Sequence, residues 1–271
     1  MLKTRIILVL VSAIIVVLIF MLPKSVVENE NQLAASNTGH TGHAADLPAN
    51  HKPTSPQLIS AISELRKAYA TSSDRKNAIF ADSLQTLYAQ AGKFDSAAWF
   101  GEQAATFFNN TLSFLKAGNS FYEAYTYAMD DQKRNDLAAK AQHWLGKAIN
   151  GNPKNYEARI KVAMTYLSTG GPMQGIRQLR EILKEDPKNE LALYNMGMLS
   201  IQSGQNAKAI DWLNQLIEVN PRHVQGQLLL GVAYLNGGHK NEARAQFEKV
   251  KKMDNDPAVQ SAADSYLKEL K

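Results

Sequence analysis

Five sets of residues recur at intervals of 34 positions in the second half of this chain. Pro153, Pro187 and Pro221 keep this interval, and each follows an Asn or an Asp. The other four columns are Ala163, Gly197 and Gly231; Gly170, Gly204 and Gly238; Gly175, Ala209 and Ala243; and Leu179, Leu213 and Phe247. Five columns in one register indicate a single supersecondary unit repeated along the chain.

The chemistry of each column predicts a helical hairpin. Small residues allow two helices to cross closely, and the glycine column suits a left-handed residue that ends the first helix. Large residues such as Leu179 and Phe247 fill the space between neighbouring hairpins. Proline follows the second helix because it cannot continue that helix. Apolar residues between these marks recur at helical spacing.

These columns resemble the tetratricopeptide repeat, a 34-residue helix–turn–helix unit, most closely between Tyr156 and Asn255. The resemblance implies an all-α solenoid of stacked hairpins that forms a right-handed superhelix with a concave inner face. A single hairpin cannot bury its apolar face alone, so the hairpins must share a continuous core. Gln57 to Ala70 and Pro257 to Leu270 are expected to form end helices that cover the stack.

Two earlier units extend the array. The unit over 78–110 has matching internal spacings at Leu84, Tyr88, Gly92, Phe94 and Ala97. The unit over 111–155 is longer, because Gly118 and Ala163 are 45 residues apart, 11 more than one repeat. The extra length predicts either longer helices or a wider loop near 130–135. Regular units follow over 156–189, 190–223 and 224–256, with an end helix over 257–270, so the predicted solenoid spans 57–271.

The first 24 residues predict a membrane anchor. Ile6 to Leu22 is an uncharged apolar run, close to the length that a transmembrane helix needs. Lys3 and Arg5 precede this run and only Lys24 follows it closely, so the positive-inside rule keeps the N-terminus in the cytoplasm. A cleaved secretory signal is the alternative. Either interpretation exports the rest of the chain, which in a bacterium places it in the periplasm.

Residues 25–56 are expected to form a disordered linker, because they contain almost no large apolar side chain. This stretch holds His40, His43 and His51. Neutral imidazole can bind Zn or Cu, but a disordered tract does not preform metal geometry, so no metal site is predicted.

Composition narrows the function further. The chain has no cysteine, 45% hydrophobic residues and a formal charge of +5. Three of those charges flank the apolar run, and no basic stripe remains to favour nucleic acid. No nucleophile elbow, phosphate-binding glycine loop or paired-histidine motif is present, so neither an enzyme, a cofactor nor a small-molecule substrate is expected.

The family resemblance places the first helix of each repeat along the concave groove. Lys161 and Asn195 are too few to predict a clamp for a peptide carboxylate. An apolar groove with methionines is better suited to an amphipathic helix or an extended apolar segment, although the same residues could pack inside the solenoid. The predicted groove residues are Glu157, Ile160, Met164, Leu191, Tyr194, Asn195, Met198, Gln202, Leu228, Val232 and Asn236.

The longer unit is a second place to look for function. Aromatic residues crowd the first two units, and most of them suit core packing. Phe121, Tyr122 and Tyr125 lie beside the enlarged hairpin and are candidate surface anchors, because Tyr is favoured at interfaces.

Together these features predict a membrane-tethered interaction scaffold or assembly factor of the bacterial cell envelope. A protein or peptide partner would bind in the groove. Two alternatives stay open: a periplasmic chaperone-like holder of exported chains, and a fixed accessory subunit of a membrane complex.

Overall fold

The structure, a computed structural model, describes residues 55–270. These residues are helical and contain no β-strand. The helices are α3 (Pro56–Thr71), α4 (Asp74–Gln90), α5 (Phe94–Phe108), α6 (Thr111–Thr126), α7 (Asp131–Gly151), α8 (Tyr156–Ser168), α9 (Pro172–Glu185), α10 (Glu190–Gln202), α11 (Asn206–Val219), α12 (Val224–Asn236), α13 (Lys240–Met253) and α14 (Pro257–Glu269).

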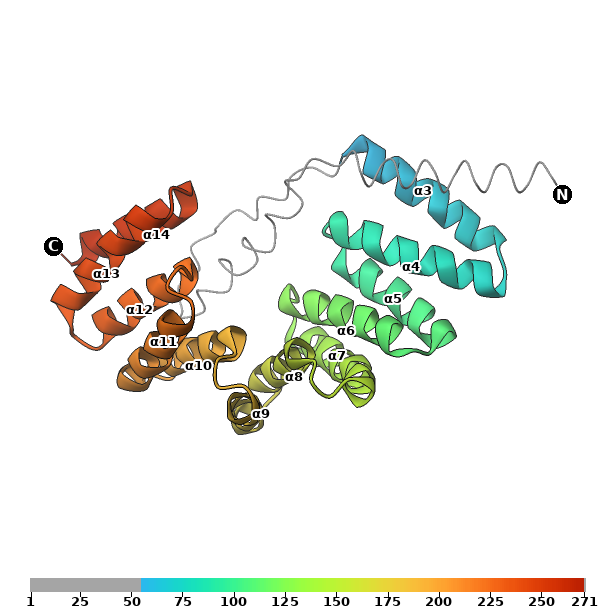
Figure 1. The fold of residues 1–271 in the computed structure, drawn as a ribbon. Helices are drawn as coiled ribbons and strands as arrows, with labels where there is room; N and C mark the ends of the chain where they lie inside the picture. The colour runs from blue at the N-terminus through green and yellow to red at the C-terminus, as the bar shows by residue number, and fades with distance from the viewer. Residues whose placement is uncertain (1–54, 271) are drawn as a thin grey trace. The chain divides into compact units, whose positions relative to one another are not determined.

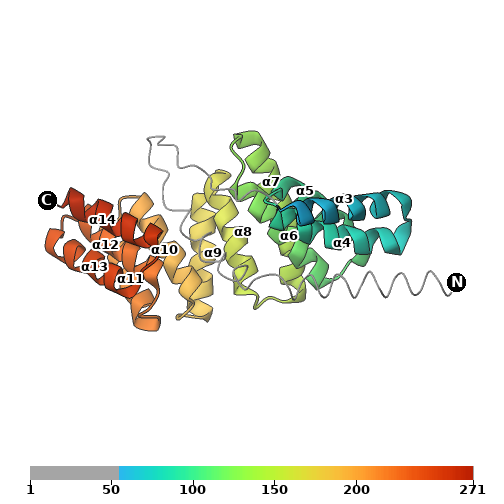
Figure 2. The same cartoon turned by 90° about the horizontal axis from the view of Figure 1, so that it is seen from above.

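The helices pack mainly on their neighbours in chain order. Helices α4 to α13 pair as five antiparallel hairpins, and the second helix of each hairpin also contacts the first helix of the next. Helix α3 packs on α4 at one end of the row and α14 on α13 at the other (Figures 1 and 2). This arrangement confirms the expected all-helical stack of hairpins.

Glycines end the turn inside four of the five hairpins. Gly92, Gly170, Gly204 and Gly238 have φ values of +67°, +86°, +70° and +81°. A residue with a Cβ atom is strained in this left-handed region, whereas glycine adopts it freely. The glycine column of the sequence therefore has the role that its position predicted.

The small-residue column lets the two helices of a hairpin cross closely. A Cβ atom added to Gly231 would lie 2.5 Å from the Phe247 ring, and one added to Gly197 would lie 2.6 Å from Leu213 Cγ. Both large side chains are fully buried. The large and small columns are thus two sides of one contact, which explains why they share a register.

A further column caps the first helices of the regular hairpins. Asn155 and Asn189 each accept a backbone hydrogen bond at 3.0 Å, from the amides of Ala158 and Ala192. His223 occupies the next position in this column, and its Nδ1 accepts from the amide of Gly226 at 3.0 Å. Side-chain acceptors at the N-cap satisfy amides that have no partner within the helix.

Longer helices account for most of the extra residues in the enlarged hairpin. Helices α6 and α7 have 16 and 21 residues, whereas α8 and α9 have 13 and 14. Helix α6 is thus three residues longer than α8, and α7 is seven residues longer than α9. These differences are close to one and two helical turns, so each helix grows without rotating its buried face. A Cβ atom added to Gly118 would lie 2.6 Å from Leu145 Cγ, which matches the Gly197–Leu213 crossing.

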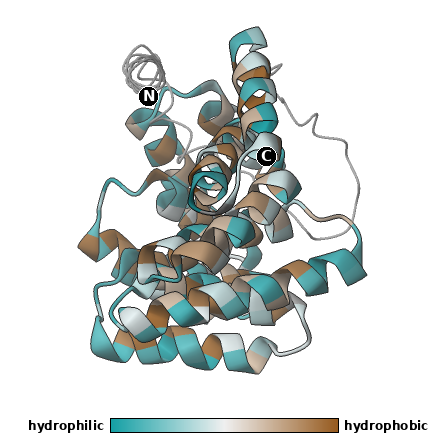
Figure 3. Ribbon diagram, turned by 90° about the vertical axis from the view of Figure 1, so that its right-hand side faces the viewer, coloured by the Kyte–Doolittle hydropathy of each residue, from teal (hydrophilic) through white to brown (hydrophobic). Residues whose placement is uncertain are grey.

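Five clusters of buried apolar residues form the core between successive helices. The cluster around Leu84 and Phe100 lies at the α3 end, and the one around Phe247 and Val250 lies at the α14 end. Figure 3 shows polar and apolar stretches alternating along single helices, the pattern of helices that bury one face.

Several predictions fall on residues 1–54, outside the described part of the chain. They are the anchor over 1–24, nearly all of the linker, and the fate of its histidines. The linker prediction ran to Pro56, but α3 begins there, and the Ser55 side chain accepts from the amide of Leu58 at 3.2 Å. Among the described helices, none combines the length and the apolar character needed to cross a bilayer.

Candidate partner-binding surface

The predicted groove residues lie on α8, α10 and α12, the first helices of the three regular hairpins. Seven of them reach the surface to some extent. Leu191 is the exposed apolar residue among these, with 43% of its surface accessible. The others are the exposed residues Glu157, Gln202 and Asn236 and the half-buried residues Met164, Leu228 and Val232.

The other four predicted groove residues belong to the core. Ile160 is 2% exposed, Asn195 6%, and Tyr194 and Met198 8% each. The Asn195 amide donates to the carbonyl of Leu191 in its own helix at 2.7 Å. They lie on the first helices α8 and α10, but neighbouring side chains cover them. Substituting them would test folding as much as binding.

Tyr194 forms the most unusual of these buried contacts. Its ring stacks on the His223 imidazole, with centroids 5.5 Å apart. The Tyr194 hydroxyl is buried and has no hydrogen-bond partner among the described residues. Burial raises the pKa of Tyr194 and lowers the pKa of His223, and the Glu190 carboxylate partly offsets the shift in the histidine pKa. Burial therefore favours the neutral form of both rings.

Polar contacts join the first helices in the N-terminal part of the stack. Lys116 Nζ on α6 lies 2.8 and 2.9 Å from the carboxylate oxygens of Asp82 on α4. The Gln85 amide donates to the carbonyl of Lys116 and to the hydroxyl of Ser120, both at 2.8 Å. Lys161 on α8 donates to Asn119 on α6 at 3.0 Å. The polar side chains of α4, α6 and α8 thus form hydrogen bonds and an ion pair between these first helices.

The three predicted surface anchors differ in position. Phe121 is 3% exposed and belongs to a core cluster, so its assignment as a surface anchor is wrong. Tyr122 and Tyr125 are half-buried, with ring centroids 5.6 Å apart, and the Tyr125 hydroxyl donates to the carbonyl of Met164 at 3.4 Å. Burial raises the pKa of Tyr122, and it also raises the pKa of the neighbouring Glu123 carboxyl.

The turn of the enlarged hairpin presents residues that the sequence analysis did not single out. Met129 is 95% exposed, and the Arg134 guanidinium holds the backbone beside it by donating to the carbonyl of Ala128 at 2.8 and 3.1 Å. In the sequence, only the departure from the 34-residue spacing indicates that this turn is unusual. It points to this hairpin, but it does not say which side chain protrudes.

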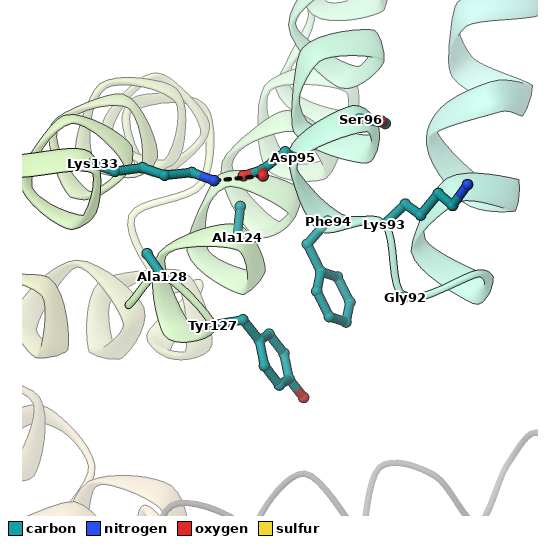
Figure 4. A pocket seen from close by; sticks show the side chains of 9 residues that line it. All are labelled: Gly92, Lys93, Phe94, Asp95, Ser96, Ala124, Tyr127, Ala128 and Lys133. Carbon is teal, nitrogen blue, oxygen red and sulfur yellow. Dashed lines mark hydrogen bonds and ion pairs between the residues drawn. The ribbon is translucent and has the colours of Figure 1, made fainter. Parts of the chain in front are cut away.

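A pocket of about 340 Å³ lies between this turn and the start of α5 (Figure 4). Its wall includes the stacked rings of Phe94 and Tyr127, with centroids 4.4 Å apart. Across from them Lys133 forms an ion pair with Asp95 at 2.6 Å. The pocket therefore combines an aromatic wall with a polar, charged one.

The described residues contain no group of three or more His, Asp or Glu side chains that could hold a metal ion. Two surfaces remain for contacts with another molecule. One consists of apolar residues on α8, α10 and α12, and the other is the aromatic wall beside the α6–α7 turn.

Comparison with known proteins identifies the repeat. Residues 174–226 and 224–257 match family models of the tetratricopeptide repeat. Among the solved structures that share the fold are two with TM-scores above 0.5. A tetratricopeptide repeat protein from Parabacteroides merdae is 20% identical, with a TM-score of 0.59, and the match covers 79% of this chain and 82% of that one.

The second is the C-terminal part of a TPR repeat-containing protein from Cytophaga hutchinsonii. It is 14% identical, with a TM-score of 0.53, and the match covers 73% of this chain and 74% of that one. No curated protein matches the sequence at a significant level. The chain therefore contains tetratricopeptide repeats, and at these identities the structural likeness concerns the fold alone.

Proposed function

We propose that this protein is a membrane-tethered scaffold of the bacterial cell envelope that holds a protein partner along α8, α10 and α12. The tetratricopeptide repeat is typical of protein–protein interaction scaffolds, and its domains bind protein or peptide partners. The observation that carries the placement is the apolar surface left on successive first helices. Leu191 is exposed there, and the half-buried residues Met164, Leu228 and Val232 lie on the neighbouring hairpins.

Membrane tethering is part of this proposal and rests on the sequence. The uncharged run from Ile6 to Leu22, with Lys3 and Arg5 before it, supports an anchor whose N-terminus stays in the cytoplasm. Alkaline carbonate extraction and protease accessibility of spheroplasts would test it. Release of the full chain by carbonate, or protection of the repeat body from external protease, would contradict the tether or its orientation.

The chain offers a matched pair of leucines for testing the groove. Leu191 and Leu112 are both exposed, at 43% and 65%, and each lies six residues before the helix-crossing glycine, Gly197 or Gly118. Full-length protein would be crosslinked in its own cells and purified with its partners. Leu191→Asp should reduce recovery of the main partner at least about tenfold, as expected for a buried interface anchor. Leu112→Asp should leave recovery largely unchanged.

Other outcomes distinguish the alternatives. A diffuse set of exported proteins would favour the chaperone-like holder. A single companion that does not exchange with labelled free companion would favour a fixed subunit. Full retention of the partner by Leu191→Asp would overturn the groove placement and direct attention to the α6–α7 turn beside Met129.

A further inference from the structure

The second helix of the third hairpin, α9, separates its charges onto two sides. Arg177, Arg180 and Lys184 follow the i, i+3, i+7 spacing that places residues on one helix face. Glu181 and Glu185 lie on the adjacent face, where Arg159 of α8 forms an ion pair with Glu185 at 2.7 Å. Glu185 therefore faces α8, and the three cations lie on the neighbouring face of α9.

A pocket of about 290 Å³ lies beside those cations, between α9 and α11. Leu183, Pro187 and the half-buried indole of Trp212 supply its apolar surface. Arg180, Lys184 and Gln215 complete the lining. The lining thus contains two cations and no carboxylate, and neither cation forms an ion pair or hydrogen bond with another described residue.

The same surface of the next hairpin lacks this combination. In the 34-residue register, Arg180, Lys184 and Trp212 correspond to Asn214, Glu218 and Gln246. Neither the cations nor the indole is needed to stack hairpins, because the α12–α13 hairpin stacks on α10 and α11 without them. Only the α9–α11 junction of the regular hairpins combines an indole with two unpaired cations.

We propose that the α9–α11 pocket binds an acidic peptide segment of a partner protein, with one apolar side chain of the segment on Trp212 and its carboxylates on Arg180 and Lys184. Charge complementarity supports this occupant, because a planar guanidinium binds a carboxylate through two parallel hydrogen bonds. The recessed position of Trp212 favours a peptide over a lipid surface, since an interfacial tryptophan would project into the bilayer. This surface is separate from the groove proposed above.

A labelled peptide can test the pocket directly. The probe is fluorescein-labelled Asp-Glu-Phe-Asp-Glu, and its binding to the full chain in a non-ionic detergent is followed by fluorescence anisotropy. Two control peptides replace the acids with Asn and Gln, or the Phe with Ala. Both controls should bind at least about tenfold more weakly, since each removes one half of the recognition.

Matched variants localise the binding. R180S with K184S should weaken the acidic peptide at least about tenfold, because both carboxylate partners are lost. K249S with K252S removes the same charge from an exposed face of α13 and should leave binding unchanged. The peptide should also shift one of the three tryptophan indole N–H signals in the NMR spectrum, the signal that disappears in Trp212→Phe. Leu191→Asp should not alter binding, so this test is independent of the groove.

Several results would overturn the proposal. These are no measurable binding of the acidic peptide, equal binding of the uncharged control, or equal losses in the two double variants. Binding to vesicles of phosphatidylcholine and phosphatidylglycerol tests whether the cations recognise lipid instead. If wild-type protein binds them better than R180S with K184S while the peptide does not bind, the cations recognise lipid and the peptide proposal is wrong.

Discussion

The two halves of the repeat body use different means to join their hairpins. Between the α4–α5 and α6–α7 hairpins, three ion pairs cross the junction: Asp82–Lys116, Asp95–Lys133 and Glu102–Lys140. Aromatic pairs accompany them, including Phe94–Tyr127 at 4.4 Å. Among the described residues, no ion pair joins the three regular hairpins to one another, and mainly aliphatic clusters fill those junctions.

The comparison shows which parts of the repeat are needed for stacking. Both halves keep a glycine of the first helix against a large side chain of the second, as in Gly118–Leu145 and Gly197–Leu213. The helix length and the chemistry of the junctions vary around that contact. These two hairpins therefore share one crossing, whereas the α4–α5 hairpin reverses it and places Gly101 of its second helix against Gln85 of its first.

The largest expected effect is a loss of stability when the large residue of the shared crossing is truncated. Leu145→Ala and Leu213→Ala each remove a fully buried side chain from the crossing and should each lower the free energy of unfolding by about 2–5 kcal/mol. Urea unfolding followed by circular dichroism would measure both. A cost for Leu145→Ala well below that for Leu213→Ala would mean that the enlarged hairpin does not rely on the same crossing.

A glycine pair should give effects of opposite sign. Gly204→Ala places a Cβ atom at φ +70° and should destabilise the protein by about 1 kcal/mol. Gly146 lies inside α7, and a Cβ atom added there meets nothing within 4 Å. Gly146→Ala should therefore stabilise the protein by about 0.5–1 kcal/mol. Thermal unfolding of both variants would show the sign, and a destabilised Gly146→Ala would contradict an extended regular helix at α7.

A smaller effect on the free energy of unfolding should depend on salt and distinguish the two kinds of junction. Asp82→Asn with Asp95→Asn removes two partly exposed inter-hairpin pairs, each worth about 0.2–1 kcal/mol at low ionic strength. The loss should nearly disappear at about 1 M salt, where the screening length is about 3 Å. Glu185→Gln, which removes a pair inside one hairpin, is the control for helix–helix charges in general. An unchanged loss at high salt would mean that packing, not charge, joins the first two hairpins.

The smallest effect concerns pH and His223. Burial lowers the pKa of this histidine, so below its ordinary pKa of about 6.5 the unfolded chain binds a proton that the folded chain resists. The stability contributed by neutral His223 is present above that pH and decreases as the pH falls. His223→Asn keeps a side-chain cap, as at Asn155 and Asn189, and should reduce the loss between pH 7.5 and 5.5. Equal losses in both proteins would place the pH dependence elsewhere.

The sequence by itself determined the repeat, the helical hairpins and the position of their turns. The reason is local: a left-handed turn such as that at Gly204 requires glycine, and a close crossing such as that at Gly231 requires a small residue. Such demands recur in all three regular hairpins and leave a visible register. The 34-residue spacing therefore specified most of the fold before any contact was known.

Tertiary structure alone decided which residues remain accessible. Helical spacing placed Tyr194, Met198 and Phe121 on particular helices, but their burial depends on side chains from neighbouring hairpins that no local pattern specifies. The exposed Met129 and the Trp212 pocket were missed for the same reason. Periodicity gives the direction in which a side chain points, and only the packed neighbours determine whether a partner can reach it.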